Sequence, residues 1–188
     1  MTELTVRPER PADLDQIRAV NEAAFGRPVE ARIVDALRGT DRWLDGGSIV
    51  AELSDGTIVG HLLLSEGDLE FDDGRPARRI WLLGPVAVTP AWQRRGIGAA
   101  LMHDAIALAA RRGQPLVCLL GHADYYPRFG FESARAIGIE PPAAWPEESW
   151  LALRLPAWSA DLRGRARYPS AFDDESRGAN SSAAELMQ

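Results

Sequence analysis

A glycine-containing loop in the middle of the chain has the composition of a diphosphate-binding site. It reads Gln93-Arg94-Arg95-Gly96-Ile97-Gly98-Ala99, and it lies between the apolar run Val86-Ala87-Val88 and a helical pattern. Glycine lets a main chain approach an anion closely and adopt positive φ, and the first turn of a helix has N–H groups without intrahelical partners. The two arginines add positive charge. The loop is therefore predicted to bind a phosphorylated ligand through its main chain.

Other interpretations of this loop are open at this point. Two glycines and two arginines before a helix also make an ordinary surface turn, which is an equally good interpretation of the loop alone. A dinucleotide-binding turn requires G-x-G-x-x-G, and the third glycine is missing. A P-loop requires Gly-Lys-Ser or Gly-Lys-Thr, and the chain contains no lysine.

Strands and helices must hold this loop, and the spacing of apolar residues predicts where they lie. Helical spacing predicts helices over residues 11–25, 29–38 and 98–112, with a short helix over 123–129. Alternating or continuous apolar runs predict strands over residues 4–7, 48–53, 57–64, 79–88, 116–120 and, as the last strand, 150–155. Ser54-Asp55-Gly56 predicts a hairpin turn, residues 66–74 an acidic loop, and Pro85 a distortion of its strand.

The composition favours one ordinary globular domain. With 188 residues the chain has room for a single domain, predicted over 1–172, and the small polar residues 173–188 predict a disordered tail. The net charge of −6 argues against a nucleic-acid partner. No apolar run approaches the roughly 20 residues that a membrane span needs. The N-terminus lacks a secretory signal, so a cytoplasmic location is expected.

The cysteine and histidine content predicts no metal site. The single cysteine, Cys118, lies inside an apolar run and is expected to be a buried, inert thiol. The three histidines, His61, His103 and His122, are scattered without the spacing of metal ligands.

Two separated motifs resemble those of the GNAT superfamily of N-acetyltransferases, and more narrowly its YhbS-like members. The loop Gln93–Ala99 matches the [QR]-x-x-G-x-[GA] signature for acetyl-coenzyme A, and Tyr125-Tyr126-Pro127-Arg128-Phe129-Gly130-Phe131 matches a later Tyr-x-x-x-Gly-Phe element. The similarity runs from Leu4 to Leu155. It implies the α/β (α+β) GNAT fold, a mixed, mostly antiparallel sheet with splayed central strands flanked by helices.

The resemblance implies acetyl-CoA as the acetyl donor, with no metal. It implies a cofactor site formed by Val86, Ala87, Val88, Gln93, Arg94, Arg95, Gly96, Ile97, Gly98 and Ala99. A main-chain N–H near Val86 would stabilise the oxyanion, and Tyr126 would be the general acid that protonates the departing thiolate. The alternative for Tyr126 is a packing residue, with Tyr125 as its competitor, and Pro127 departs from the expected motif.

Several residues are candidates for the general base and for the acceptor site. Glu66 is the candidate base, with Asp68, Glu70, His61 and His122 as alternatives, and ordered water could replace a single base. The superfamily's acceptor site borders the first two helices, which makes Phe25, Arg27 and Glu30 candidates to line it. The alternative is that these three residues only pack and solvate the helix ends.

The expected function is therefore transfer of an acetyl group from acetyl-CoA to an amine of a small molecule or peptide, by direct attack in a ternary complex. The first alternative is a non-catalytic acyl-CoA sensor of the same fold. The second alternative is a protein interaction domain that uses the acidic loop. The sequence leaves the acceptor open, and equally whether the chain is a monomer or a homodimer.

Overall fold

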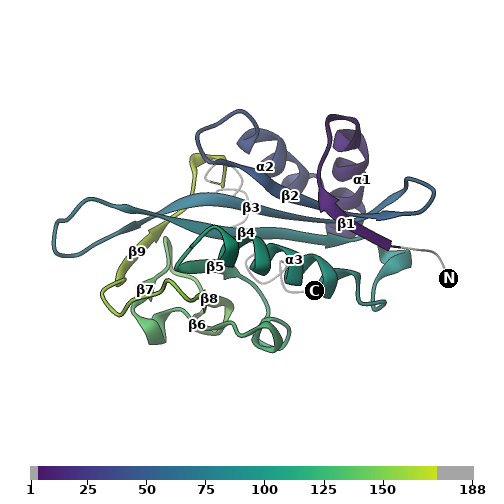
Figure 1. Ribbon diagram of the computed structural model, residues 1–188. Helices are drawn as coiled ribbons and strands as arrows, with labels where there is room; N and C mark the ends of the chain where they lie inside the picture. The colour runs from purple at the N-terminus through teal and green to yellow at the C-terminus, as the bar shows by residue number, and fades with distance from the viewer. Residues whose placement is uncertain (1–3, 173–188) are drawn as a thin grey trace. The chain divides into compact units, whose positions relative to one another are not determined.

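The computed structural model describes residues 4–172 (Figure 1). These residues divide into two compact units. The first unit comprises residues 4–65 and 83–108, and the second comprises residues 66–82 and 109–172. Strands β3 (Ile58–Glu70) and β4 (Arg78–Val88) and helix α3 (Ile97–Arg111) have residues in both units. The predicted tail 173–188 lies outside the described residues, and the single domain over 1–172 stays a prediction.

The first unit is built on an antiparallel ribbon of strands. Strand β1 (Leu4–Pro8) pairs with β2 (Trp43–Leu53), and β2 pairs with β3, in the order β1-β2-β3-β4. Strand β1 is an edge strand, as its terminal proline predicts. Asp55 and Gly56 form the predicted hairpin turn between β2 and β3, with Gly56 at φ +87° and the Gly56 N–H donating to the Leu53 carbonyl at 2.9 Å.

Helices cover both faces of this ribbon (Figure 1). Helices α1 (Leu14–Phe25) and α2 (Val29–Leu37) lie on one face, where Asn21 of α1 contacts His61 of β3. Helix α3 lies on the other face, against Gly60. Successive residues of a strand point to opposite faces of the sheet. Gly60 therefore faces α3, and His61 faces α1.

The second unit has its own sheet and core. Strand β4 pairs in parallel with β5 (Leu116–Leu120), β5 pairs antiparallel with β8 (Trp150–Arg154), and β8 pairs with β6 (Glu132–Ser133). Strand β9 (Gly164–Arg167) pairs antiparallel with the end of β3 and parallel with β7 (Ile139–Glu140). Cys118 is fully buried in this core as predicted, and burial raises the pKa of its thiol.

Short 3-10 helices connect these elements, and they span Pro11–Asp13, Pro90–Trp92, Tyr126–Phe129, Arg135–Ile137, Glu147–Ser149 and Ser170–Phe172.

Three predictions about local structure were wrong. Strand β3 continues to Glu70, so Glu66, Asp68 and Glu70 lie on a strand and not in a loop. Strand β9 follows the segment predicted to be the last strand. The helix predicted over residues 123–129 is only the 3-10 helix Tyr126–Phe129.

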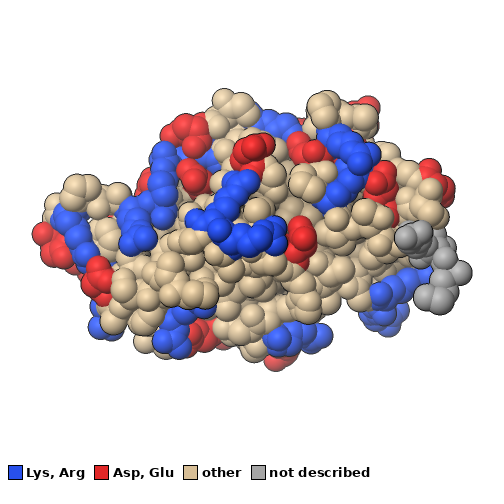
Figure 2. Space-filling model, in the orientation of Figure 1, with Lys and Arg blue, Asp and Glu red and all other residues tan. Residues whose placement is uncertain are grey.

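Charged residues of both signs are interspersed over the face drawn in Figure 2. This agrees with a chain that carries 21 basic and 27 acidic residues. Among residues 4–172, no helix has both the length and the apolar character needed to cross a bilayer.

Candidate active site

The predicted diphosphate loop has a main chain that bends sharply before α3. Arg94 has φ +59° and Gly96 has φ +83°, both in the left-handed region, while Gln93 is extended. The Gly96 carbonyl accepts the first helical hydrogen bond, from the Ala100 N–H at 3.0 Å. The N–H groups of residues 97–99 therefore lie in the first turn, where an α-helix provides no intrahelical acceptor and the positive end of its dipole attracts anions.

Side chains stiffen this loop from outside. The Gln93 amide donates to the Val88 carbonyl at 3.1 Å, and the Arg95 guanidinium lies 4.8 Å from the centre of the Trp92 ring. Both contacts tie the loop to the segment just before it. The loop is thus held at its entry by Gln93 and at its exit by the start of α3.

Helix α3 lies on the sheet at a glycine. A Cβ at Gly60 would come within 2.9 Å of Ile97 Cγ2 and 3.0 Å of Leu101 Cδ1, closer than packed carbon atoms approach. Ile97 and Leu101 are both buried. The missing side chain at Gly60 therefore lets the first two turns of α3 reach the strand, which fixes the position of the N–H groups described above.

The end of strand β4, whose residues are candidates for the cofactor site, precedes this loop. Val86, Ala87 and Val88 end β4, with Ala87 buried and the two valines partly exposed. The Gly84–Pro85 peptide is cis and β4 runs through it from Arg78 to Val88, so the distortion predicted at Pro85 stays a prediction. Just beyond the strand, the Thr89 N–H donates to the Val59 carbonyl at 3.0 Å, which anchors this end of β4 to β3.

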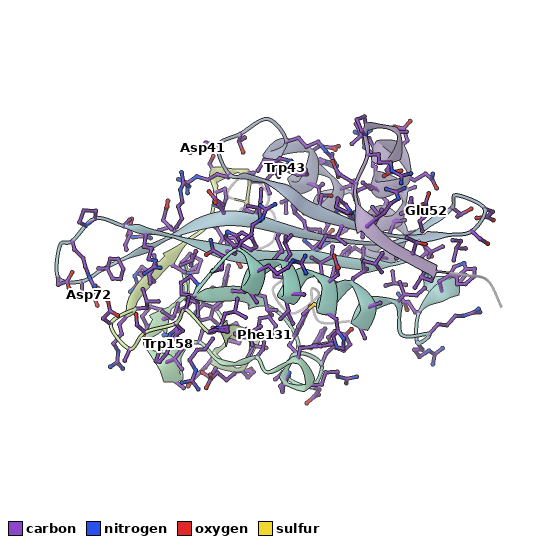
Figure 3. All side chains as sticks on the ribbon, viewed as in Figure 1. Asp41, Trp43, Glu52, Asp72, Phe131 and Trp158 are labelled. Atoms are coloured by element: carbon purple, nitrogen blue, oxygen red, sulfur yellow. The ribbon has the colours of Figure 1, made fainter. Side chains whose placement is uncertain are left out.

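Tyr126, the candidate acid, opens a 3-10 helix in the second unit. Its ring meets the edges of Tyr125 and Phe131 at centroid distances of 5.1 and 5.9 Å, and Phe131 is labelled in Figure 3. Among the described residues its hydroxyl makes no hydrogen bond. Burial, with a smaller effect of Tyr125, raises the pKa of Tyr126 to about 12. Pro127 is accommodated in the first turn of the 3-10 helix.

The candidate base Glu66 faces an arginine. Arg79 Nε lies 3.7 Å from a Glu66 carboxylate oxygen, and Arg79 Nη1 lies 3.6 Å from Asp68. Glu70 is paired with Arg167 at 2.7 Å. The three carboxylates considered from the sequence thus all have a guanidinium partner.

The candidate acceptor residues lie where α1 passes into α2. Phe25 ends α1 and Gly26 follows at φ +68°, with its N–H bonded to the Glu22 carbonyl at 2.8 Å. Glu30 is 5% exposed and accepts hydrogen bonds from Arg27, the nearest atoms being 2.6 Å apart. Glu30 is thus a buried, paired carboxylate, and Phe25 is partly exposed.

A buried polar chain in the first unit was missed from the sequence. His61 is fully buried, with Nδ1 3.0 Å from Asn21 Nδ2 and Nε2 3.0 Å from Ser48 Oγ. Ser48 also bonds to Glu9, which Arg38 holds at 2.7 Å. Burial lowers the pKa of His61 to about 3. Both ring nitrogens have protein partners, so the imidazole is occupied within the fold. No sequence signal marks this group of hydrogen-bonded side chains, since its members come from five separate segments of the sequence.

Comparisons with known proteins agree with this architecture. A family model described as an acetyltransferase (GNAT) domain matches residues 5–134. The chain is 34% identical over 160 residues to the uncharacterized N-acetyltransferase YjhQ of Escherichia coli strain K12, a match that covers 83% of this chain and 87% of that protein.

Two solved structures are similar over almost their whole length. One is the GNAT family N-acetyltransferase YhbS of Escherichia coli in complex with CoA, with a TM-score of 0.79 and 25% identity, covering 92% of this chain and 93% of that one. The other is a GNAT family acetyltransferase of Brucella melitensis in complex with acetyl-CoA, with a TM-score of 0.73 and 33% identity, covering 91% of this chain and 99% of that one.

The fold and these matches define an acetyltransferase. The chain belongs to the GNAT acetyltransferase family. The resemblance to YhbS-like members and the fold class, a mostly antiparallel mixed sheet with helices, are thereby confirmed. Within residues 4–172, no group of three or more histidine, cysteine, aspartate or glutamate side chains could hold a metal ion.

Proposed function

We propose that this protein transfers the acetyl group of acetyl-CoA to an amine of a small molecule or peptide, by direct attack in a ternary complex. The observation that carries the proposal is the bend at Arg94 and Gly96, which leads into the open first turn of α3. A thioester of coenzyme A presents a diphosphate that this turn suits. The matched structures of YhbS and of the Brucella acetyltransferase contain CoA and acetyl-CoA.

The proposed cofactor site has two parts. Main-chain N–H groups of Gln93–Ala99 would bond the diphosphate, with Arg94 and Arg95 adding charge. Main-chain groups of Val86–Val88 would bond the pantetheine arm, and an N–H near Val86 would stabilise the oxyanion. Stabilisation by such fixed dipoles is commonly the largest single contribution to acyl transfer.

The reaction needs one bond made, one broken and two protons moved. The neutral amine nitrogen attacks the thioester carbonyl carbon, which forms the C–N bond and places negative charge on the carbonyl oxygen. The C–S bond then breaks and the thiolate of coenzyme A leaves. The thiolate takes a proton from Tyr126, and the nitrogen loses one to a base, for which Glu66 or ordered water is the candidate.

Two observations support Tyr126 as the acid. Its hydroxyl makes no hydrogen bond to any residue that the structure describes, so it is available to a ligand. Its pKa of about 12 keeps the phenol protonated at neutral pH. Phe25 and Glu30 are proposed as acceptor-binding residues because they lie at the junction of α1 and α2.

Release of free coenzyme A tests the proposal. Purified protein is mixed with acetyl-CoA and a panel of amines that includes polyamines, amino acids, aminoglycosides and peptides. Thiol release with at least one amine is expected, and Tyr126→Phe should lower kcat by roughly 10²-fold. Tyr125→Phe is the matched control and should have a much smaller effect.

Binding measurements separate the alternatives. Coenzyme A should raise the melting temperature, because a ligand that binds only the native state stabilises it. Coenzyme A binding without thiol release on any amine would favour the sensor. Failure of coenzyme A to raise the melting temperature would favour the interaction domain.

A further inference from the structure

We infer that Gly121 is a positioning residue for Tyr126. Because Gly121 has no side chain, the phenol ring of Tyr126 fits against the Gly121 Cα. The inference about catalysis rests on the proposed function, in which Tyr126 supplies a proton. Gly121 directly follows strand β5, and neither of the two GNAT motifs includes it.

The contact is closer than any side chain would allow. A Cβ built on Gly121 would lie 2.2 Å from Tyr126 Cε2, 2.9 Å from Cδ2 and 3.0 Å from Cζ. Non-bonded carbon atoms prefer about 3.5–4.0 Å. Even alanine at position 121 would therefore force the ring, and the hydroxyl carried by Cζ, to move.

Space, and not backbone conformation, explains this glycine. Gly121 does not have a positive φ, whereas Gly130 at φ +91° and Gly138 at φ +85° are left-handed. A substitution at Gly121 thus adds a clash without adding backbone strain, while one at Gly130 would add strain.

The main chain at Gly121 cannot easily recede. Its N–H donates to the Ser149 carbonyl at 2.9 Å, and the preceding Leu120 is paired with Trp150 of β8. A side chain at position 121 would therefore displace the Tyr126 ring and not the main chain. Tyr125 and Phe131 already flank it, so a displaced ring must also disturb these contacts.

The structural arm of the test uses the apo protein labelled with ¹³C-tyrosine. The chain has only three tyrosines, Tyr125, Tyr126 and Tyr168, so Tyr125→Phe and Tyr126→Phe assign every ring signal. Gly121→Ala should shift the Tyr126 signals and leave Tyr168, which packs among Trp145, Trp150 and Phe172, in place. Unchanged Tyr126 signals would overturn the inference, whether or not the protein has activity.

The kinetic arm is a double-mutant cycle with an amine accepted by the wild type. Gly121→Ala should lower kcat by on the order of 10²-fold, the usual effect of misplacing a reacting group by about 1 Å, with an unchanged KM for acetyl-CoA. In the Tyr126→Phe background, Gly121→Ala should lower kcat no further. Equal losses in both backgrounds would refute a role through Tyr126.

Two further results keep the inference separate from its premise. If Gly121→Ala fails to fold, adding Tyr126→Ala should restore folding because the clashing ring is gone, and failure to restore it would refute the contact. If the wild type acetylates no amine, the proposed function fails and with it any catalytic role of Gly121, while the tyrosine signals still decide whether Gly121 places the ring.

Discussion

Ser48 and His61 lie in hydrogen-bond contact inside the first unit, with Oγ and Nε2 3.0 Å apart. The direction of this contact follows from Asn21, whose amide can only donate to the other ring nitrogen. The proton of the neutral imidazole is therefore on Nε2 and is donated to Ser48, which donates to Glu9. Ser48 is an acceptor from the histidine and not a nucleophile activated by it.

We predict that this buried histidine makes the protein less stable in mild acid. The pKa of His61 is lowered to about 3 by burial, against about 6.5 in an unfolded chain. Between these values the unfolded state binds a proton that the folded state does not, so stability falls as pH decreases from about 6.5 towards 3. The slope should approach about 1.4 kcal/mol per pH unit, measured by urea denaturation at pH 5, 6 and 7.

The matched variant for this measurement is His61→Gln, which keeps a hydrogen-bonding side chain without a titrating ring. It should be less stable at pH 7 and should lose most of the dependence between pH 5 and 7. A wild-type protein with equal stability at pH 5 and pH 7 would contradict the buried neutral imidazole.

A second prediction compares a buried with an exposed ion pair. Asp13 accepts two hydrogen bonds from Arg7 and one from the Arg10 N–H, and the Arg7 bonds are the chief cause of its lowered pKa. The side chains of Arg7 and Asp13 are only 10% and 7% exposed. Asp13→Ala leaves the buried guanidinium with Glu52 as its remaining carboxylate partner and should cost about 2–3 kcal/mol in unfolding free energy.

Glu70→Ala is the control for this pair. Glu70 and Arg167 are 51% and 47% exposed at a similar distance of 2.7 Å, so the loss should be below about 1 kcal/mol. Equal losses for the two variants, measured by chemical denaturation, would show that burial does not determine the strength of the Arg7 pair.

A third prediction separates charge from strain in the diphosphate loop. Arg94 adopts a left-handed φ of +59°, which only glycine adopts freely. Arg94→Gly and Arg94→Ala remove the same charge, and both should weaken coenzyme A binding measured by calorimetry. Arg94→Gly should be more stable than Arg94→Ala by about 1 kcal/mol, because only glycine relieves the strain.

Either half of that prediction can fail by itself. Unaltered coenzyme A affinity in both variants would remove the Arg94 side chain from the proposed cofactor site. Equal melting temperatures would show that the left-handed conformation carries no cost, and would leave the charge effect intact.

A fourth prediction concerns the alkaline limb of the pH–rate profile. A general acid works in its protonated form, and the pKa of Tyr126 is raised to about 12. With saturating acetyl-CoA and amine, kcat should therefore show no decline between pH 8 and 10. A decline in this range that disappears in Tyr126→Phe, but not in Tyr125→Phe, would contradict the raised pKa.

Local patterns predicted the parts of the fold that depend on neighbours in sequence. The helices, the hairpin at Asp55-Gly56 and the edge strand β1 follow from periodicity, turn residues and proline. The left-handed conformation of Gly96 is one that glycine readily adopts, so it could be predicted from the sequence. The left-handed conformation of Arg94 could not, because arginine has no preference for this region.

Non-local pairing explains what the sequence could not indicate. Residues 66–70 follow the shorter strand predicted over residues 57–64 and extend it, and residues 68–70 pair with β9, a strand that the sequence did not predict. Strand β9 has only four residues and depends on β3 and β7. The space at Gly121 is likewise invisible in sequence, since the contact becomes apparent only when the Tyr126 ring is placed.

The burial of Cys118 determines how this protein behaves in the presence of thiol-reactive dyes. The chain has one cysteine, and in the folded state it is inaccessible, with the reactive thiolate suppressed by a raised pKa. A colorimetric dye can therefore be present throughout turnover without modifying the enzyme. If colour develops slowly without substrate, up to one equivalent per chain, its rate would instead measure how fast the second unit opens and exposes Cys118.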